Sequence, residues 1–406
     1  MIKECIGCGA NTTKKLIDLG PQPPSNRYLS GTRESIGTHH IEFGICTACG
    51  LAQLLNPMAP DLVRSRFEWI SYNEPEGHLD DLVEILAKKI DLSVKTHIVG
   101  VTYKDDSTLA RFNYKGVADT YRLNQADDLQ MDEPLASLET IQHALSPDAA
   151  KKLAGKIGQA DILLVRHILE HAHDPRRLLE ACRNLCKPGG MLVIEVPDCR
   201  KVLDGHDHCF LWEEHISYYT PETLRRFFEV NGLSDIDMRI YKYPMEDSLV
   251  AIVYNVSTSS AQLEIKTGME MARVERFVST FSSRGAKIKQ HLQSLRSQGK
   301  RVALFGAGHL AAKFINFYRL EDCLIGVIDD NPNKLGRHMP GSKLPIIGSD
   351  CLEKGEVDLC LLALNPESEQ KVLKAKAEYC TGGGKFRSIF SASANSINQD
   401  INDDRA

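Results

Sequence analysis

The 406-residue sequence lacks a long apolar run and a leader-like N-terminus. Its apolar runs have the length of a strand, as at residues 162–165 and 359–364, whereas a membrane-spanning helix needs about 20 apolar residues. The first residues, MIKEC, place no apolar segment behind the basic residue, unlike a secretory signal. We therefore expect a cytoplasmic protein without a membrane partner.

The sequence also lacks an excess of one charge. Lys and Arg number 49 and Asp and Glu number 54, so the net charge is −5. This balance argues against a nucleic-acid partner and against an acidic interaction tail. With 42% hydrophobic and 25% charged residues the composition is that of a globular protein, and the length predicts two or three domains.

Four of the twelve cysteines form two equal motifs, Cys5-x-x-Cys8-Gly and Cys46-x-x-Cys49-Gly. Each pair can bind one metal ion from a tight turn, and the glycine that follows can adopt the positive φ that the turn needs. Two pairs give four thiolates, which suit tetrahedral Zn²⁺. We prefer this interpretation to a redox-active pair, because there are two motifs and neither lies in a βαβ pattern. With four protein ligands the zinc would be structural.

The chain between and after these motifs predicts an α/β protein. Pro21, Pro23 and Pro24 predict a loop-like excursion between the cysteine pairs. Beyond them, strands alternate with helices, which is typical of a parallel sheet. The expected elements are a helix at 79–92, strands at 96–102, 160–165 and 191–196, a helix that restarts at Asp174-Pro175, a helix from Thr220 to Gly232, and strands at 233–240 and 249–254.

A second α/β unit follows a polar linker and an amphipathic helix. Strand 301–305 leads into Gly306-Ala-Gly308, and Asp329 ends the next strand. This is the form of a dinucleotide-binding fingerprint, in which small residues admit a pyrophosphate and a carboxylate holds the ribose. The alternative is a Rossmann-like domain without a ligand, whose glycines only allow close packing. Asn365 follows strand 359–364, where a doubly wound sheet places ligand contacts, so it is a candidate to bind the nucleotide; the alternative is that it belongs to a plain loop.

These observations predict five consecutive segments. They are a zinc-binding module at 1–58, a central domain at 59–256, a linker helix at 257–299, a Rossmann-like domain at 300–390 and a disordered tail at 391–406.

Motifs along nearly the whole chain carry a resemblance to one family. In this order they resemble the zinc-containing sugar C-methyltransferases, which act on nucleotide-activated keto sugars. The resemblance implies that the central domain is a doubly wound class I methyltransferase fold that binds S-adenosylmethionine (SAM). The matching stretches are residues 17–20, 46–54, 160–171, 189–197, 213–219, 326–334 and 338–341.

The resemblance also implies catalytic and substrate-binding residues. Such enzymes remove a proton beside a ketone, and the resulting enolate attacks the sulfonium methyl group. His215 matches the base and Glu214 its carboxylate partner. Trp212 and Trp69 stand where the family has tyrosines, and Tyr72 lies nearby, so we expect these three side chains to contact the substrate.

The SAM loop departs from the family pattern. Val101, Tyr103 and Ser107 stand where an acidic residue and two glycines are expected, so the Tyr103 ring would fill cofactor space unless the loop takes another path. The remaining cofactor-binding candidates are Asp105 and Asp106 for the amine, Asp119 for the ribose, and His167.

Two classes of function are therefore open. The order of motifs favours a SAM-dependent C-methyltransferase, since loops diverge more readily than a whole domain order arises by chance. The altered loop favours a diverged relative that binds a sugar nucleotide or a partner protein, or catalyses another reaction. A nicotinamide dehydrogenase based on the glycine fingerprint is less favoured, because it leaves the rest of the chain unexplained.

Overall fold

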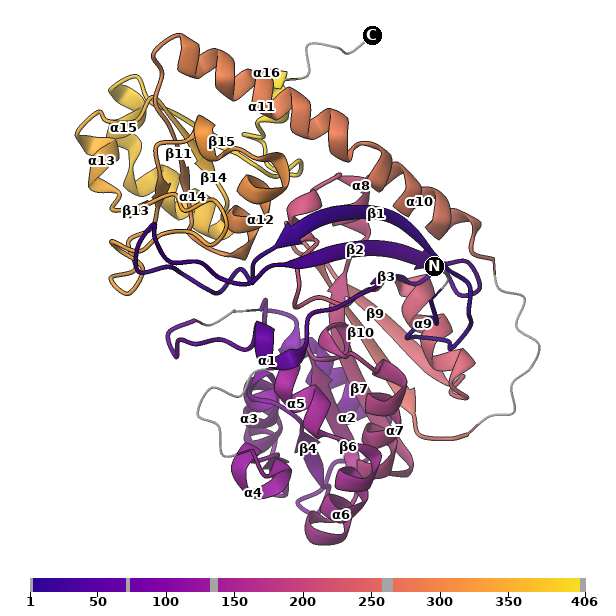
Figure 1. Ribbon diagram of the computed structural model, residues 1–406. Helices are drawn as coiled ribbons and strands as arrows, with labels where there is room; N and C mark the ends of the chain where they lie inside the picture. The colour runs from indigo at the N-terminus through magenta and orange to yellow at the C-terminus, as the bar shows by residue number, and fades with distance from the viewer. Residues whose placement is uncertain (1–2, 71–73, 132–137, 258–265, 402–406) are drawn as a thin grey trace. The chain divides into compact units, whose positions relative to one another are not determined.

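The computed structural model describes residues 3–70, 74–131, 138–257 and 266–401 (Figure 1). The chain divides into two compact units, and each is built from several segments. Unit 1 consists of Met1–Lys15, Phe43–Arg200 and Glu214–Met271, and unit 2 of Leu16–Glu42, Lys201–Glu213 and Ala272–Ala406.

Unit 1 contains a six-stranded sheet in the order β5-β4-β6-β7-β10-β9. The first four strands are parallel, as the alternation of strands and helices predicts. β10 runs antiparallel to both β7 and β9, and the short connection between β9 and β10 is that of a hairpin. The strands are β4 (Ile98–Gly100), β5 (Thr120–Arg122), β6 (Ala160–Arg166), β7 (Cys186–Asp198), β9 (Ile236–Tyr241) and β10 (Asp247–Tyr254).

Helices cover both faces of this sheet (Figure 1). Successive side chains of a strand point to opposite faces, so Leu163 and Val165 pack with α6, α7 and α9, while Ile162 and Leu164 pack with α2 and α3. The result is the three-layered arrangement of a doubly wound fold. The helices are α2 (Leu79–Lys89), α3 (Asp106–Tyr114), α6 (Pro147–Ile157), α7 (Pro175–Leu185) and α9 (Pro221–Val230).

Helix starts in unit 1 follow the capping residues of the sequence. Asp174 accepts a hydrogen bond from the Arg177 N–H at 3.0 Å, and Pro175 is the first residue of α7. Thr220 forms a capping box with Thr223 at the start of α9. The other short elements before the linker are α1 (Pro60–Val63), η1 (Tyr103–Asp105), α4 (Gln125–Leu129), α5 (Leu138–Ala144), η2 (Leu169–His171), α8 (Arg200–Asp204) and η3 (His208–Phe210).

The predicted loop-like segment between the cysteine pairs is found only at residues 23–38, which include Pro23 and Pro24; the rest of the segment is not loop-like. It contains the long strands β1 (Thr13–Gln22) and β2 (His39–Cys46), which form a sheet in the order β1-β2-β3-β8 with β3 (Ala52–Leu54) and β8 (Ser217–Tyr218). Ile41, Phe43 and Ile45 alternate along β2 and are all buried, and this period of two is typical of a strand.

Unit 2 contains a five-stranded, fully parallel sheet in the order β13-β12-β11-β14-β15. This is the arrangement expected of a Rossmann-like domain. Its strands are β11 (Val302–Phe305), β12 (Val327–Ile328), β13 (Ile346–Ile347), β14 (Leu359–Leu362) and β15 (Lys385–Ser388). Its helices and turn are α12 (His309–Tyr318), η4 (Glu321–Cys323), α13 (Asp350–Glu353), α14 (Pro366–Ala375) and α15 (Ala377–Thr381).

The linker is helical as expected, but the tail is not disordered throughout. The linker forms α10 (Gly268–Ser279) and α11 (Phe281–Ser297). In the tail, Ile397 is fully buried and Asp400 pairs with Arg387 at 2.7 Å, and α16 spans Asn398–Ile401. One apolar side chain thus anchors a segment whose Ser, Asn and Asp content predicted disorder; residues 402–406 lie outside the described part.

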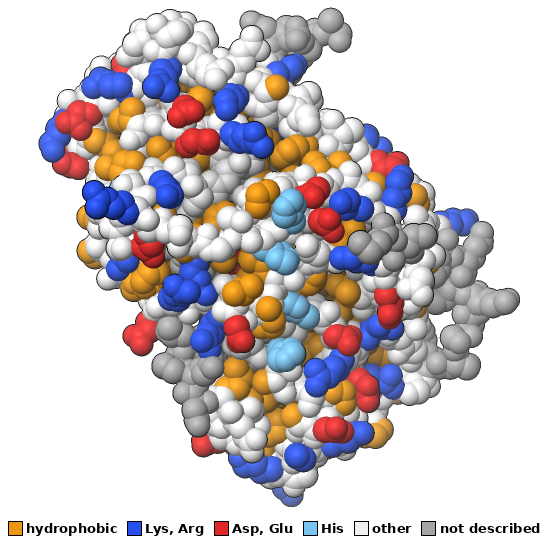
Figure 2. All heavy atoms as spheres, in the orientation of Figure 1, with side chains coloured by type: hydrophobic (Ala, Val, Ile, Leu, Met, Phe, Trp, Pro, Cys, Tyr) orange, Lys and Arg blue, Asp and Glu red, His pale blue; other side chains and the backbone are white. Residues whose placement is uncertain are grey.

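The surface agrees with the balanced composition. Figure 2 shows Lys and Arg side chains interspersed with Asp and Glu over the visible face. Among the helices that the structure describes, none is long and apolar enough to cross a bilayer.

A buried ion pair joins three segments of unit 2. Lys313 on α12 lies 2.6 Å from the Glu213 carboxylate, and both side chains are fully buried. Lys313 also donates to the Pro23 carbonyl at 3.2 Å, and Glu213 accepts from the Ser25 N–H. These contacts explain why residues 16–42 and 201–213 belong to this unit.

We expect Lys313→Met to destabilise unit 2 by about 3–5 kcal/mol, because Glu213 would keep a buried charge without its partner. Thermal or urea denaturation measures the change. The control is Lys371→Met, which replaces an exposed lysine of α14. Equal stability of the two variants would contradict a structural role for the pair.

Candidate functional site

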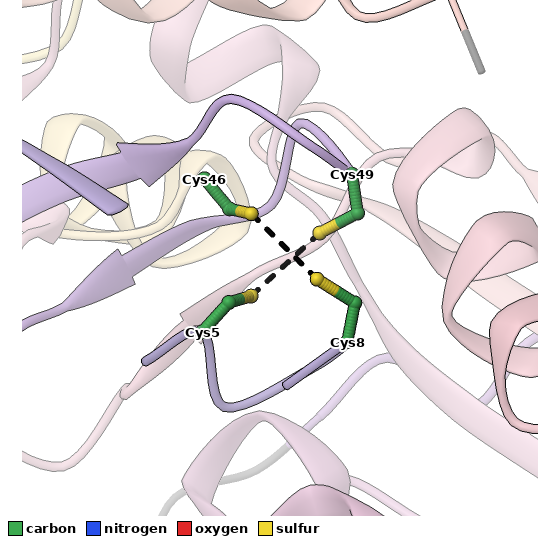
Figure 3. Close-up of side chains that lie close together, drawn as sticks. All are labelled: Cys5, Cys8, Cys46 and Cys49. Carbon is green, nitrogen blue, oxygen red and sulfur yellow. Dashed lines mark hydrogen bonds between the residues drawn. The ribbon is translucent and has the colours of Figure 1, made fainter. Parts of the chain in front are cut away.

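The four cysteines of the paired motifs converge in unit 1 (Figure 3). The Sγ atoms of Cys5 and Cys49 are 3.7 Å apart, and so are those of Cys8 and Cys46. Four thiolates bound to zinc at about 2.3 Å in a tetrahedron are about 3.8 Å apart. The cluster therefore fits one Zn²⁺ ion with four protein ligands, which makes the site structural.

Local backbone geometry holds the cysteines in place. Gly9 and Gly50 have φ of +77° and +80°, and their N–H groups donate to the carbonyls of Cys5 and Cys46. Gln53 donates from Nε2 to the Cys5 sulfur at 3.4 Å, as expected of a donor around a thiolate ligand.

A second cluster lies where β6 and β7 end. The buried Glu195 carboxylate contacts Arg166 Nε at 2.5 Å, His167 Nε2 at 3.2 Å and His78 Nε2 at 3.1 Å. Ser248 Oγ donates to it at 2.6 Å. Burial alone would raise the pKa of Glu195, but the charge and hydrogen bond of His167 and the neighbouring His78 and Arg166 lower it well below its usual range.

His167 is held as a cation in this cluster. Burial opposes its charge, but the carboxylates of Glu74 and Glu195 dominate and raise the pKa of His167 to about 10. Its φ of +50° is rare for a residue other than glycine, and it turns the chain from β6 into η2.

Asp105 organises the loop after β4. Its carboxylate accepts from the N–H groups of Val101 at 2.8 Å, Thr102 at 2.9 Å and Arg166 at 3.2 Å. The loop is thereby wound into η1, and its backbone donors are used within the chain. Tyr103 is 44% exposed, so its ring does not occupy the interior. Whether this ring narrows the cofactor site is not decided by its exposure, so the expected filling stays a prediction.

The remaining cofactor candidates lie at opposite ends of the sheet. Asp106 pairs with Arg122, the last residue of β5, at 2.9 Å. Asp119 precedes β5 and pairs with His97 at 3.0 Å, so it lies at the amino end. Ligands of open α/β sheets bind at the carboxyl ends of the strands, and the structure therefore does not bring Asp119 together with the other candidates.

A third cluster joins η2 to the segment before β8. Ligand atoms of Glu170, His171 and His215 all lie within 4.8 Å of one another. The rings of His171 and His215 are nearly perpendicular, with centroids 4.8 Å apart. Glu214, the predicted partner of His215, is buried. His215, the predicted base, thus lies among further titratable side chains.

The glycine fingerprint of unit 2 is already engaged. Gly306 has φ of +102°, and Gly308 precedes α12. Asp329, expected to bind a ribose, instead accepts from the Ala307 N–H at 3.0 Å and from Lys334 Nζ at 2.7 Å. Tyr28 donates to the Ala307 carbonyl at 2.6 Å. Intramolecular contacts therefore occupy the groups that a nucleotide would use.

The other predicted substrate residues have separate surroundings. Trp212 stacks on His309 in unit 2, with ring centroids 4.0 Å apart. Asn365 caps α14 by accepting from the Ser368 N–H at 2.8 Å. Trp69 stacks on Phe67 in unit 1, with centroids 4.9 Å apart, and Tyr72 lies outside the described residues.

Sequence reasoning missed Arg166, Glu195 and Glu170 as members of the site. A signal was present for the first two: each is a charged residue within or directly after an apolar strand segment. Such residues are rarely buried without a partner, so a buried ion pair was predictable in kind, although not in its pairing.

Three family models match successive parts of the chain. The sequence matches a zinc binding domain over residues 5–63, a methyltransferase domain over 81–237 and a C-methyltransferase C-terminal domain over 239–390. The C-methyltransferase NovU of Streptomyces niveus is 22% identical, over 95% of this chain and 94% of that protein.

Two further similarities are partial. A ubiquinone biosynthesis O-methyltransferase of Roseobacter denitrificans is 27% identical over 28% of this chain and 52% of that protein. A solved structure of 1,6-didemethyltoxoflavin-N1-methyltransferase from Burkholderia thailandensis is 14% identical, with a TM-score of 0.31 over 45% of this chain and 80% of that chain.

Metal analysis should give one zinc ion per chain, and the double variant Cys5→Ser, Cys8→Ser should lose it. Because a structural zinc site contributes about 10 kcal/mol or more of binding free energy, we expect this variant to lose the fold of the zinc module. Cys380→Ser, which changes an exposed cysteine, should keep the ion. A metal-free protein with four free thiols at these positions would contradict the assignment.

Asp105→Ala should lower the free energy of unfolding by roughly 3 kcal/mol, because it leaves the buried N–H groups of Thr102 and Arg166 without an acceptor, while the Val101 N–H keeps only the Leu164 carbonyl. Chemical denaturation measures the loss.

Asp105→Asn tests the charge separately. Burial raises the pKa of Asp105 to about 6 from about 4 in the unfolded chain, so the folded state holds this proton more tightly. Wild type should therefore lose stability relative to Asp105→Asn as pH rises from about 4 to about 6, by about 3 kcal/mol. A pH-independent difference between the two proteins would contradict the shift.

Proposed function

Because the chain belongs to the family of C-methyltransferases that begin with a zinc binding domain, we propose that it methylates the carbon beside a ketone in a nucleotide-activated sugar. As a member of this family it is a SAM-dependent methyltransferase. The observation that carries the proposal is the match of three successive domains, in one order, to residues 5–390. The keto-sugar acceptor is supported by the resemblance of residues 213–219 and 326–334.

The carboxyl end of β6 offers a group that fits SAM. Arg166 is 1% exposed, and its Nη2 atom has no hydrogen-bond partner among the described residues. A buried guanidinium donor is suited to a carboxylate, such as that of the methionine part of SAM. We propose that Arg166 binds the methionine end, with His167 and Asp106 beside it.

The reaction needs a group that accepts a proton from the acceptor carbon. SAM supplies an electrophilic methyl group on a sulfonium. The hydrogen on a carbon beside a ketone is acidic enough for a carboxylate or imidazole base to remove it. We assign this proton transfer to the Glu214–His215 pair, where a half-buried imidazole follows a buried carboxylate.

One observation favours a second candidate function. The N–H groups of Val101 and Thr102, which a SAM loop would offer to its cofactor, donate to Asp105 instead. A diverged relative that binds a sugar nucleotide or a partner protein without methyl transfer is consistent with this loop. The complete domain order gives the methyltransferase precedence.

We further propose that the protein acts in the cytoplasm on a small molecule. None of the twelve cysteines forms a disulfide, and most are buried. Cysteines that stay unpaired are typical of a reducing compartment.

His215→Ala should lower methyl transfer from SAM to a keto-sugar nucleotide by about 100-fold or more, because proton transfer is lost. It should also abolish uptake of solvent deuterium at the acceptor carbon, measured by mass spectrometry. His40→Ala, at an exposed histidine that binds Asp18, is the matched control. Deuterium uptake at the wild-type rate in His215→Ala would reject the role of this pair.

Calorimetry with SAM tests the alternative directly. Wild type should bind SAM, and Arg166→Lys should bind it more weakly because it loses the planar fork of donors. No heat of binding at millimolar SAM would favour the diverged relative.

A further inference from the structure

Strand β8 connects the zinc module to the predicted base. It consists of Ser217 and Tyr218 and begins two residues after His215. Its antiparallel partner is β3, which follows the second cysteine pair and places Gln53 opposite Ser217. We propose that Gln53 is a positioning residue, which acts through β8 to hold the His215 imidazole in place for proton transfer. All these residues belong to unit 1, and their part in catalysis rests on the proposed function.

The Gln53 side chain binds the first cysteine pair with both ends of its amide. Its Nε2 donates to the Cys5 Sγ at 3.4 Å, and its Oε1 accepts a hydrogen bond from the Ile6 N–H at 3.1 Å. Gln53 is 1% exposed, so water does not compete for either contact. Because the backbone of the same residue is paired with β8, Gln53 joins the metal-binding turn to the strand that follows His215.

The residue after the predicted base is held from two sides. The Ile216 N–H donates to the Glu170 carbonyl of η2 at 2.8 Å, and the Ile216 carbonyl accepts from the Leu54 N–H at the end of β3, also at 2.8 Å. Ile216 is buried. The peptide next to His215 therefore lies between η2 and β3, and a displacement of β3 is transmitted to it.

Two rings restrict the His215 imidazole itself. The centroid of the Tyr218 ring lies 6.4 Å from that of His215, and the His171 ring lies 4.8 Å away. Both arrangements are edge-to-face, which is a favourable geometry at these distances. Tyr218 in turn contacts Phe43 of β2 edge-to-face at 5.2 Å. One of the two rings that hold the imidazole is thus carried by the strand that Gln53 attaches to the zinc module.

A purely structural role of Gln53 makes a different prediction. If this residue only stabilises the zinc module, its loss lowers the melting temperature and leaves the surroundings of His215 unchanged. If it positions His215, its loss alters the environment of that imidazole in a protein that keeps its fold and its zinc.

The experiment compares full-length, zinc-containing wild type with Gln53→Met, whose side chain has a similar length but neither amide group. Histidine is isotope-labelled, and the ring resonance of His215 in the NMR spectrum is assigned by its loss in His215→Ala. We expect Gln53→Met to shift this resonance and to leave that of the exposed His40 in place. The control is Gln159→Met, which removes a hydrogen bond to the Asn184 carbonyl next to the start of β6 and should shift neither resonance.

Enzyme kinetics give a second measurement. Because a misplacement of about 1 Å can lower a rate about 100-fold, we expect the kcat of Gln53→Met to fall by about 10–100-fold, with an unchanged KM for SAM. Phe43→Leu removes the ring contact with Tyr218 without changing a contact of the cysteines, and it should lower kcat and shift the His215 resonance in the same way.

Zinc content and melting temperature verify that each variant is folded. An unchanged His215 resonance in folded, zinc-containing Gln53→Met overturns the proposal, and so does a kcat equal to that of wild type. If Gln53→Met does not fold, Phe43→Leu decides: a shifted His215 resonance supports the attachment through β8, and an unchanged one overturns it.

The resonance is measured without SAM or sugar, so the two proposals can fail separately. A shifted His215 resonance in a protein that transfers no methyl group supports the link from Gln53 to His215 and contradicts only the proposed function. Methyl transfer at equal rates by wild type and Gln53→Met supports the proposed function and overturns the positioning role.

Discussion

The Glu195 carboxylate receives a guanidinium, two imidazoles and a hydroxyl inside the unit 1 sheet. A carboxylate has about four lone-pair sites, so these partners fill its capacity. Arg166 and the cationic His167 compensate its charge, and loss of either would leave the buried carboxylate incompletely paired. The end of β6 is therefore tied to β7 by charged side-chain contacts.

The features around the candidate site follow from this arrangement. The backbone N–H of Arg166 also donates to the Asp105 carboxylate, which connects β6 to the loop after β4. His167, with its positive φ, places η2 and hence Glu170 and His171 at the edge of the sheet. The loop after β4 lacks the glycines of a SAM-binding loop at residues 101–107. A network of charged side chains around Asp105 and Arg166 lies next to it.

Local patterns made the zinc centre and most elements predictable. The Cys-x-x-Cys-Gly motifs encode their own turns, and Asp174 and Thr220 mark helix starts through contacts three residues away. The partners of Glu195 are 28 to 117 residues distant in sequence, and no local signal specifies such pairings. The prediction that Asp119 binds the cofactor is wrong for the same reason. Sequence spacing does not give the register of β5, which begins at Thr120, so that Asp119 lies before the strand and not after it.

Residues 16–42 and 201–213 complete unit 2, although most of that unit comes from residue 272 onward. A ribosome delivers both early segments before α12, with its Lys313, has been made. The early segments must therefore wait for a late partner, while unit 1 has all its residues once position 271 emerges. A cut between the methyltransferase domain (81–237) and the C-terminal domain (239–390) would separate Glu213 from Lys313. Biophysical work should therefore use the full-length protein.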